Sequence, residues 1–312
     1  MRNNNSFAKS VKEEIASKDY SSERILAILS SFIRLNGSLI INNKKEFITL
    51  KMENSKIAKF IYHSVQKVFG INPMISYLKK ANFNQNTCYV ITIRNVDYLT
   101  KLHINFLENK IDKIFAKNME TIGGYLAGAF LATGSVNSPR NSDYHLEITF
   151  PNENMAKWFI RLMNHYRGSQ FMAKTIKRRD KYIMYLKRSD QIVDFLVLIG
   201  ATDACLYFEN QRVDRDFSNI TNRLQNLDTA NLAKTLKAAK NDIRIIKRLI
   251  AKNGFINFTN EKMAKLCELR LKYPEATLDE LADYLSSEIG HNVSKSNVNH
   301  LLRAIRVAGQ NI

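Results

Sequence analysis

The chain has 312 residues, with 47 lysines and arginines against 29 aspartates and glutamates, so its formal charge is +18. Its three isolated cysteines, Cys88, Cys205 and Cys267, include no Cys-x-x-Cys pair, which argues against a disulfide framework and a structural zinc site. Because no run of about twenty uninterrupted apolar residues is present, we expect no membrane span and no membrane partner.

A positive charge of this size favours binding to polyanions such as nucleic acids. A genome of low GC content would also enrich lysine, asparagine and isoleucine, so the distribution of charge along the chain has to decide. The amino terminus is polar and lacks an apolar signal core. We therefore expect a cytoplasmic protein.

Two segments read as copies of one motif. Residues 29–38 (LSSFIRLNGS) and 126–135 (LAGAFLATGS) each form an apolar helix pattern that ends in a small polar residue, glycine and serine. The glycines, Gly37 and Gly134, lie 97 residues apart. Nearly the same offset, 98 residues, relates residues 54–60 (NSKIAKF) to residues 152–158 (NENMAKW) downstream. This repetition predicts an internal duplication.

The periodicity predicts two αββαββα units, at about 22–118 and 120–200, in an α+β domain with pseudo-two-fold symmetry covering residues 1–220. The first unit begins with a helix that ends at about residue 35. Two strands follow, near 38–41 and 46–52, then a helix near 55–69 and two further strands near 74–80 and 87–94. In the second unit a strand at 144–150 precedes a helix near 153–166 and strands near 170–176 and 181–187.

The two motif segments resemble the LAGLIDADG motif of homing endonucleases, in which paired helices each end in an acid that holds a catalytic divalent metal. Here the acid positions are Asn36 and Thr133, which carry no charge. A hard cation that cleaves phosphodiesters needs carboxylates, so the resemblance implies the fold without the chemistry. We predict no catalytic residues, no metal and no cofactor; an active endonuclease would need other carboxylates, such as Asp143 and Glu147.

A basic run from residue 161 to residue 188 contains nine lysines and arginines against a single acid, Asp180. The resemblance places the strands of this run on the face that straddles DNA. The candidate DNA contacts are Lys177, Arg178, Arg179 and Lys181. A solvated hairpin explains the same pattern nearly as well.

Past residue 200 the sequence predicts helices only. A helix from about 229 to 251 has a single apolar seam (Leu232, Leu236, Ala239, Ile243, Ile246, Ile250) beside many lysines and arginines, with Asp242 as the lone acid. We predict that residues 221–254 form a basic linker helix region, which either contacts phosphate or is simply solvated. Upstream, Arg223 is a further candidate DNA contact in an amide-rich stretch.

The last domain, residues 255–312, reads as a helix-turn-helix that begins at the break near Gly254. A helix at 261–272 is followed by a second that opens with the capping box Thr277 to Glu280, and Ser294 caps a third helix at 295–307. The turn at 286–293 is long, which favours a sigma-factor-like variant. The outward residues of the third helix are candidates for base readout (Ser296, Asn299, His300, Arg303) and for phosphate contact (Lys295, Arg306).

Taken together, residues 229–239 (TANLAKTLKAA), 269–281 (LRLKYPEATLDEL) and 294–303 (SKSNVNHLLR) resemble the WhiA family of bacterial regulators over essentially the whole chain. The resemblance implies a non-catalytic transcriptional regulator of double-stranded DNA, associated with the nucleoid and with cell division, chromosome segregation or sporulation control. RNA polymerase or another regulator is a further implied partner. The alternatives are an active endonuclease and a protein-interaction scaffold; the DNA target, the sign of regulation, the ligand of the endonuclease-like domain and the oligomeric state stay open.

Overall fold

The computed structural model describes residues 6–42, 45–79, 87–94, 97–105, 111–141, 143–166, 170–253 and 260–310. Arg167 of the basic run and the predicted break at Gly254 lie outside these ranges. The chain divides into two compact units, residues 1–215 and 216–312, and each is described by itself. Within the described residues, no helix combines the length and apolar character needed to cross a bilayer.

The first unit contains two copies of the same succession of elements. The first copy consists of α2 (Ser22–Asn36), β1 (Gly37–Asn42), β2 (Lys45–Met52), α3 (Ser55–Phe69), β3 (Met74–Lys79), β4 (Thr87–Arg94) and α4 (Asp97–Lys101). The second consists of α5 (Met119–Thr133), β5 (Gly134–Val136), β6 (Leu146–Phe150), α6 (Glu153–Asn164), β7 (Lys174–Arg178), β8 (Lys181–Leu186) and α7 (Ser189–Leu198), with the 3-10 helix η1 (Lys113–Ala116) between the copies. The predicted αββαββα duplication is confirmed.

Each copy folds into an antiparallel four-stranded sheet, in the orders β1-β2-β4-β3 and β5-β6-β8-β7. Asn54 and Asn152, which open the second shared sequence segment, cap α3 and α6 by accepting backbone hydrogen bonds. Equivalent residues therefore perform the same local task in both copies.

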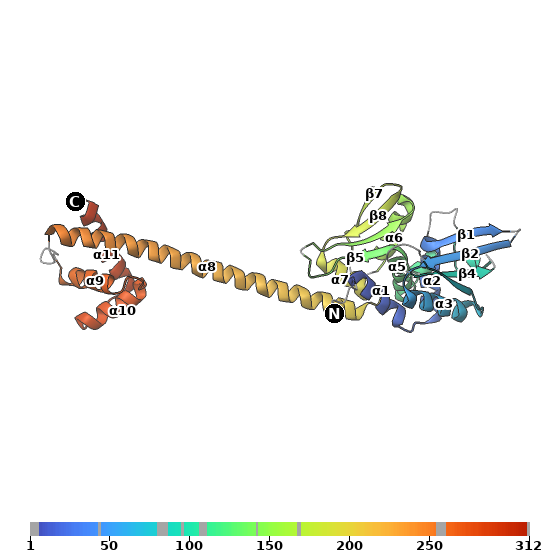
Figure 1. Ribbon diagram of the computed structural model, residues 1–312, viewed down its shortest axis with the longest axis horizontal. Helices are drawn as coiled ribbons and strands as arrows, with labels where there is room; N and C mark the ends of the chain where they lie inside the picture. The colour runs from blue at the N-terminus through green and yellow to red at the C-terminus, as the bar shows by residue number, and fades with distance from the viewer. Residues whose placement is uncertain are drawn as a thin grey trace. The chain divides into compact units, whose positions relative to one another are not determined.

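The motif helices α2 and α5 lie side by side between the two sheets (Figure 1). Glycine makes this approach possible, because a Cβ added to Gly128 would overlap the carbonyl of Ile28, and one added to Gly124 would lie 2.6 Å from the carbonyl oxygen of Arg24. One apolar core joins both helices to the inner faces of both sheets. The packing brings the two motif ends into one region of the unit.

A further helix, α1 (Phe7–Ser17), precedes the duplication and packs on α3, α5 and β5. Ser6 caps it, and Val11 and Ile15 are fully buried. The sequence interpretation did not include this helix, although its apolar residues at a spacing of four signal one turn after another.

The helix predicted at 229–251 is part of a longer one, α8, which runs over Thr202–Asn253. The amide-rich stretch before residue 229 contains neither proline nor glycine, so nothing in it interrupts the helix. The buried residues near the carboxyl end are Ala239, Asp242, Ile246 and Leu249, whereas Leu232 is exposed. The predicted seam was therefore wrong in part.

The second unit also contains α9 (Glu261–Lys272), α10 (Leu278–Ile289) and α11 (Lys295–Gln310), packed with the end of α8 around one apolar core. The predicted capping box is present, because Thr277 and Glu280 each bond the other's backbone N–H. The turn between α10 and α11 is shorter than predicted, because α10 continues past Ser286 to Ile289. The Ser286 hydroxyl donates to the Ala282 carbonyl oxygen and accepts a hydrogen bond from the Val293 N–H. Gly290, at φ 74°, ends that helix.

Candidate nucleic-acid interface

The acid positions of the two motifs lie at the ends of α2 and α5, and both side chains are engaged by a neighbouring strand. The Asn36 Oδ1 accepts a hydrogen bond from the Lys51 backbone N–H in β2, at 3.3 Å. The Thr133 Oγ1 donates to the Thr149 carbonyl in β6, at 2.9 Å. Each side chain thus fastens its motif helix to a strand of its own copy, and neither offers the charged oxygen that a divalent metal requires.

Two cavities open beside these helix ends, and the duplication relates them to each other. The first, of about 870 Å³, is lined by Asn36, and the second, of about 530 Å³, is lined by Thr133. Leu131, Ala132 and Gly134 line the first cavity, and their counterparts Arg34, Leu35 and Gly37 line the second. The two cavities therefore occupy equivalent positions in the two copies.

Basic side chains reach both cavities. Lys9, Lys12 and Lys51 line the first, together with Glu13, which pairs with Lys56 at 2.8 Å, and Glu53. Arg34 and Lys181 line the second, whose described lining has no acidic residue. These groups suit an anion rather than a divalent cation, so the metal of the endonuclease fold does not fit these residues.

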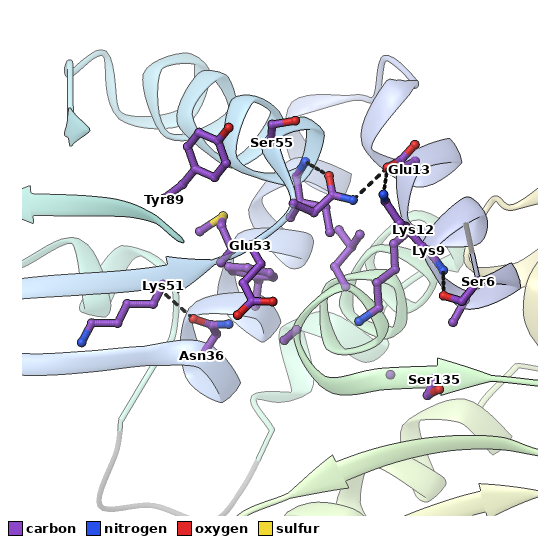
Figure 2. Close-up of a pocket in the computed structure, with 18 of the residues that line it drawn as sticks. Ser6, Lys9, Lys12, Glu13, Asn36, Lys51, Glu53, Ser55, Tyr89 and Ser135 are labelled. Atoms are coloured by element: carbon purple, nitrogen blue, oxygen red, sulfur yellow. Dashed lines mark hydrogen bonds and ion pairs between the residues drawn. The ribbon is translucent and has the colours of Figure 1, made fainter. Parts of the chain in front are cut away.

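Lys12 is the lysine of the first cavity whose acidity is most altered. Its side chain runs from α1 into the cavity, toward the side where Asn36 and Glu53 lie (Figure 2). Its ammonium nitrogen lies 5.8 Å from the centroid of the Phe130 ring, and burial lowers the pKa of Lys12 to about 8. Sequence reasoning missed this residue because α1 was not predicted and the contact is a tertiary one.

The carboxylates considered as substitutes for the missing acids, Asp143 and Glu147, line neither of the two cavities. Glu147 lies on β6 and accepts from His145 at 3.1 Å, while Asp143 precedes that strand. Within the described chain, no group of three His, Cys, Asp or Glu side chains is placed to hold a metal ion.

The basic hairpin β7–β8 is formed, and strand alternation separates its candidate residues. Arg178 and Lys181 face each other across the hairpin, on the face of the sheet that does not join the core. Lys177 points to the opposite face, where its ammonium lies 6.0 Å from the Tyr182 ring centroid, and Arg179 forms the turn at φ 55°. Lys174 lies four residues before Arg178 on β7, and an even spacing along a strand places both side chains on the same face. The outer face therefore combines Lys174, Arg178 and Lys181.

Lys187, just past β8, also reaches this face, because its ammonium lies 5.8 Å from the ring centroid of Tyr185, the cross-strand partner of Lys174. Two arginines of the basic run lie elsewhere. Arg161 lies on α6 and stacks over Trp158, at 5.1 Å from its ring centroid. Arg188 pairs with Asp190 at 2.8 Å. The run read from the sequence as one stretch of charge is thus divided among a helix, a hairpin and a helix start.

The third helix of the second unit, α11, has the predicted inner face. Val298, Leu301, Leu302 and Ile305 are buried in the core that α11 shares with α8, α9 and α10. The Ser294 Oγ accepts from the Asn297 backbone N–H at 3.3 Å, as expected of the cap. The core and the cap therefore fix the position of α11, and with it the positions from which its outer side chains project.

The six predicted contact residues of α11 fall into two sets. Ser296, His300 and Arg303 are exposed and follow a spacing of four and three, which places them on one face. Lys295, Asn299 and Arg306 lie to one side of that face, and Asn299 is half-buried.

Two of the flanking residues are engaged by acids. Arg306 donates to both carboxylate oxygens of Asp242 in α8, at 2.6 and 3.0 Å, and this bond raises the pKa of Arg306. Lys295 pairs with Asp279 at 2.6 Å. Asp242, the lone acid of the predicted linker helix, is buried and anchors α11 to α8.

Arg223, the remaining candidate, is exposed on α8, where every side chain from residue 222 to residue 234 is exposed. The structure does not bring it together with the face formed by Ser296, His300 and Arg303.

This architecture defines a class of protein: a tandem LAGLIDADG-like unit without its motif acids, followed by a helix-turn-helix domain. Models of the WhiA N-terminal LAGLIDADG-like domain, the WhiA LAGLIDADG-like domain and the WhiA C-terminal HTH domain match residues 22–104, 122–218 and 221–308. The chain belongs to the WhiA family.

Similar proteins cover nearly its whole length. The probable cell division protein WhiA of Lactobacillus gasseri is 37% identical over 314 residues, with 98% of each chain covered. That of Enterococcus faecalis is 35% identical, with 96% of each covered. The crystal structure of full-length DUF199/WhiA from Thermatoga maritima covers 99% of both chains with a TM-score of 0.61 at 20% identity, a likeness of fold.

Proposed function

We propose that the protein is a non-catalytic, sequence-specific DNA-binding regulator in which α11 reads bases and the LAGLIDADG-like unit contacts phosphates. The observation that carries this proposal is the exposed face of α11. Ser296, His300 and Arg303 project from a helix that its own core holds rigid, within the domain that matches the WhiA helix-turn-helix model. Such a helix fits the major groove, where each good bidentate contact contributes about 1–3 kcal/mol of discrimination.

The outer face of β7–β8 supports the phosphate-contacting role. Lys174, Arg178 and Lys181 present three cations on one side of a sheet. Contacts of this kind carry no base information but supply affinity that decreases with salt. We assign these contacts to residues 1–220 and base readout to residues 255–312, with 221–254 as the connection.

The chemistry of the motif ends supports the absence of cleavage. Asn36 and Thr133 are neutral and hydrogen-bonded to strands, and lysine and arginine side chains line the cavities where the endonuclease fold needs carboxylates. We therefore propose that the fold holds DNA without cutting it.

Because the similar proteins are named probable cell division proteins, we place this regulator in the control of cell division. Chromosome segregation and sporulation control are the neighbouring processes that the resemblance implies. In this proposal the protein acts in the cytoplasm at the nucleoid, with RNA polymerase or another regulator as a protein partner.

Selection of genomic fragments by the purified protein at about 150 mM salt tests the base-reading role, because salt weakens phosphate contacts and leaves base contacts. We expect the wild-type chain to enrich a short set of fragments and Ser296→Ala/Arg303→Ala to lose that set. Ser287→Ala/Arg248→Ala removes the same two chemical groups elsewhere in the second unit and should retain it.

Enrichment of the same fragments by Ser296→Ala/Arg303→Ala would show that α11 does not read the sequence. The selected fragments should also stay intact with Mg²⁺ or Mn²⁺. Cleavage that disappears in Glu147→Gln would contradict the non-catalytic part of the proposal.

A further inference from the structure

An apolar stripe lies on the stretch of α8 that no other part of the described chain covers. Phe217, Ile220, Leu224 and Leu227 are 72%, 57%, 57% and 58% exposed. Val213, also exposed, continues the stripe toward the amino end. Exposing large apolar side chains together to water is unfavourable in free energy. Their alignment along the helix distinguishes them from single apolar residues scattered over a surface.

The spacing of the stripe is that of a coiled coil. From Val213 the intervals are four, three, four and three, which repeats every seven residues and keeps the stripe on one seam. In this heptad Phe217 and Leu224 take the a positions, and Val213, Ile220 and Leu227 take the d positions. The seam predicts a partner helix with the same repeat.

A second copy of α8 supplies such a helix. In a parallel pair, the residue before an a position faces the residue five places further on in the partner, so Arg223 of one helix would face Asp228 of the other. The two-fold symmetry makes this attractive pair twice. Asn231 takes the next a position after Leu224, where an asparagine pairs with its own copy and fixes a parallel register.

We propose that the protein self-associates through a parallel two-stranded coiled coil formed by α8, centred on Phe217, Ile220, Leu224 and Leu227. This inference concerns assembly and does not depend on DNA binding. The apolar seam and the charged residues that flank it lie on the same stretch of α8.

Sedimentation velocity on the full chain over a concentration series tests the proposal. The wild-type mass should rise from 36.0 kDa toward twice that value, while Ile220→Glu/Leu224→Glu should stay at the monomer mass. Asn222→Glu/Thr229→Glu adds the same charge on the opposite face of the helix and should associate like the wild type. A wild-type chain that remains a monomer throughout, or an unaltered Ile220→Glu/Leu224→Glu variant, would overturn the proposal.

Oxidative cross-linking tests the orientation. Leu224→Cys, at an a position, should give a disulfide-linked dimer, because in a parallel pair the two residues 224 face each other. Asn222→Cys retains the same native cysteines and should cross-link at least tenfold less. Equal cross-linking of both variants, or none in Leu224→Cys, contradicts parallel pairing through this seam.

Discussion

At the scale of single residues, the motif positions retain a structural task after losing their acids. Asn36 and Thr133 each bind a backbone group of the neighbouring strand, so the helix ends stay fixed without charge. Lys12 then brings an ammonium group into the first of the two cavities. The two motif ends therefore carry neutral, hydrogen-bonded side chains, and lysines reach the cavity beside Asn36.

The buried ammonium of Lys12 should make stability depend on pH. Its folded pKa of about 8 lies below the ordinary lysine pKa of 10.5, so between these pH values the unfolded chain binds more protons and the free energy of unfolding rises with pH. Replacing Lys12 by methionine removes this dependence. We expect Lys12→Met to stabilise the first unit by about 1–2 kcal/mol more at pH 7 than at pH 9.5.

Urea unfolding at pH 7 and pH 9.5, followed by the fluorescence of Trp158, the single tryptophan, measures the free energy of unfolding of the first unit. Lys51→Met, an exposed lysine of the same cavity, is the control and should show no such difference between the two pH values. An equal effect of Lys12→Met at both values would mean that burial does not disfavour the ammonium.

At the scale of elements, α11 shows that residues predicted to lie on one outer face can have different roles. Arg303 and Arg306 are three residues apart and both look outward in the sequence. Only Arg303 is exposed, whereas Arg306 bridges to the buried Asp242 of α8. We infer a structural role for Arg306 and a DNA-reading role for Arg303.

Replacing each arginine by alanine separates these roles. Arg306→Ala leaves Asp242 buried without its partner, at a cost of about 2 kcal/mol, so amide exchange in α11 and the end of α8 should become more than tenfold faster. Arg303→Ala should leave exchange unchanged and lose fragment selection. Hydrogen exchange with peptide resolution measures both; unchanged exchange in Arg306→Ala would return Arg306 to the set of phosphate contacts.

The elements themselves were largely predictable from the sequence, because local signals define them. The cap residues Asn54 and Thr277 and the alternation of Leu146, Ile148 and Phe150 mark where helices and strands begin and which face is buried. The paired motif helices followed from the repeat and from the resemblance of both copies to the LAGLIDADG motif.

Tertiary contacts were not predictable in the same way. The ion pair between Asp242 and Arg306 joins residues 64 apart, and the entry of Lys12 into the cavity depends on how α1 packs. The start of α8 at Thr202 was missed because amide-rich sequence also suits turns and caps. These errors affected the assignment of individual site residues more than the fold.

At the scale of the whole molecule, the account divides the work between two kinds of contact. In the proposed function the hairpin β7–β8 contributes the cations for the DNA backbone, and α11 contributes the side chains for reading the sequence. In the first sheet, the described side chains of the equivalent strand β3 include four exposed apolar residues, Met74, Ile75, Tyr77 and Leu78, where β7 carries cations. Duplication has thus preserved the fold while the two copies present different surfaces.

The salt dependence of binding to one selected fragment tests this division most directly. In Arg178→Ala/Lys181→Ala the slope of log K against log salt should become shallower by about 1.8, since each phosphate contact contributes about 0.9, while the preference for that fragment over others stays the same. Lys59→Ala/Lys157→Ala removes two exposed lysines from equivalent positions on α3 and α6, on the core side of the sheets, and should keep the wild-type slope. A wild-type slope in Arg178→Ala/Lys181→Ala, or a lost fragment preference, would contradict the account.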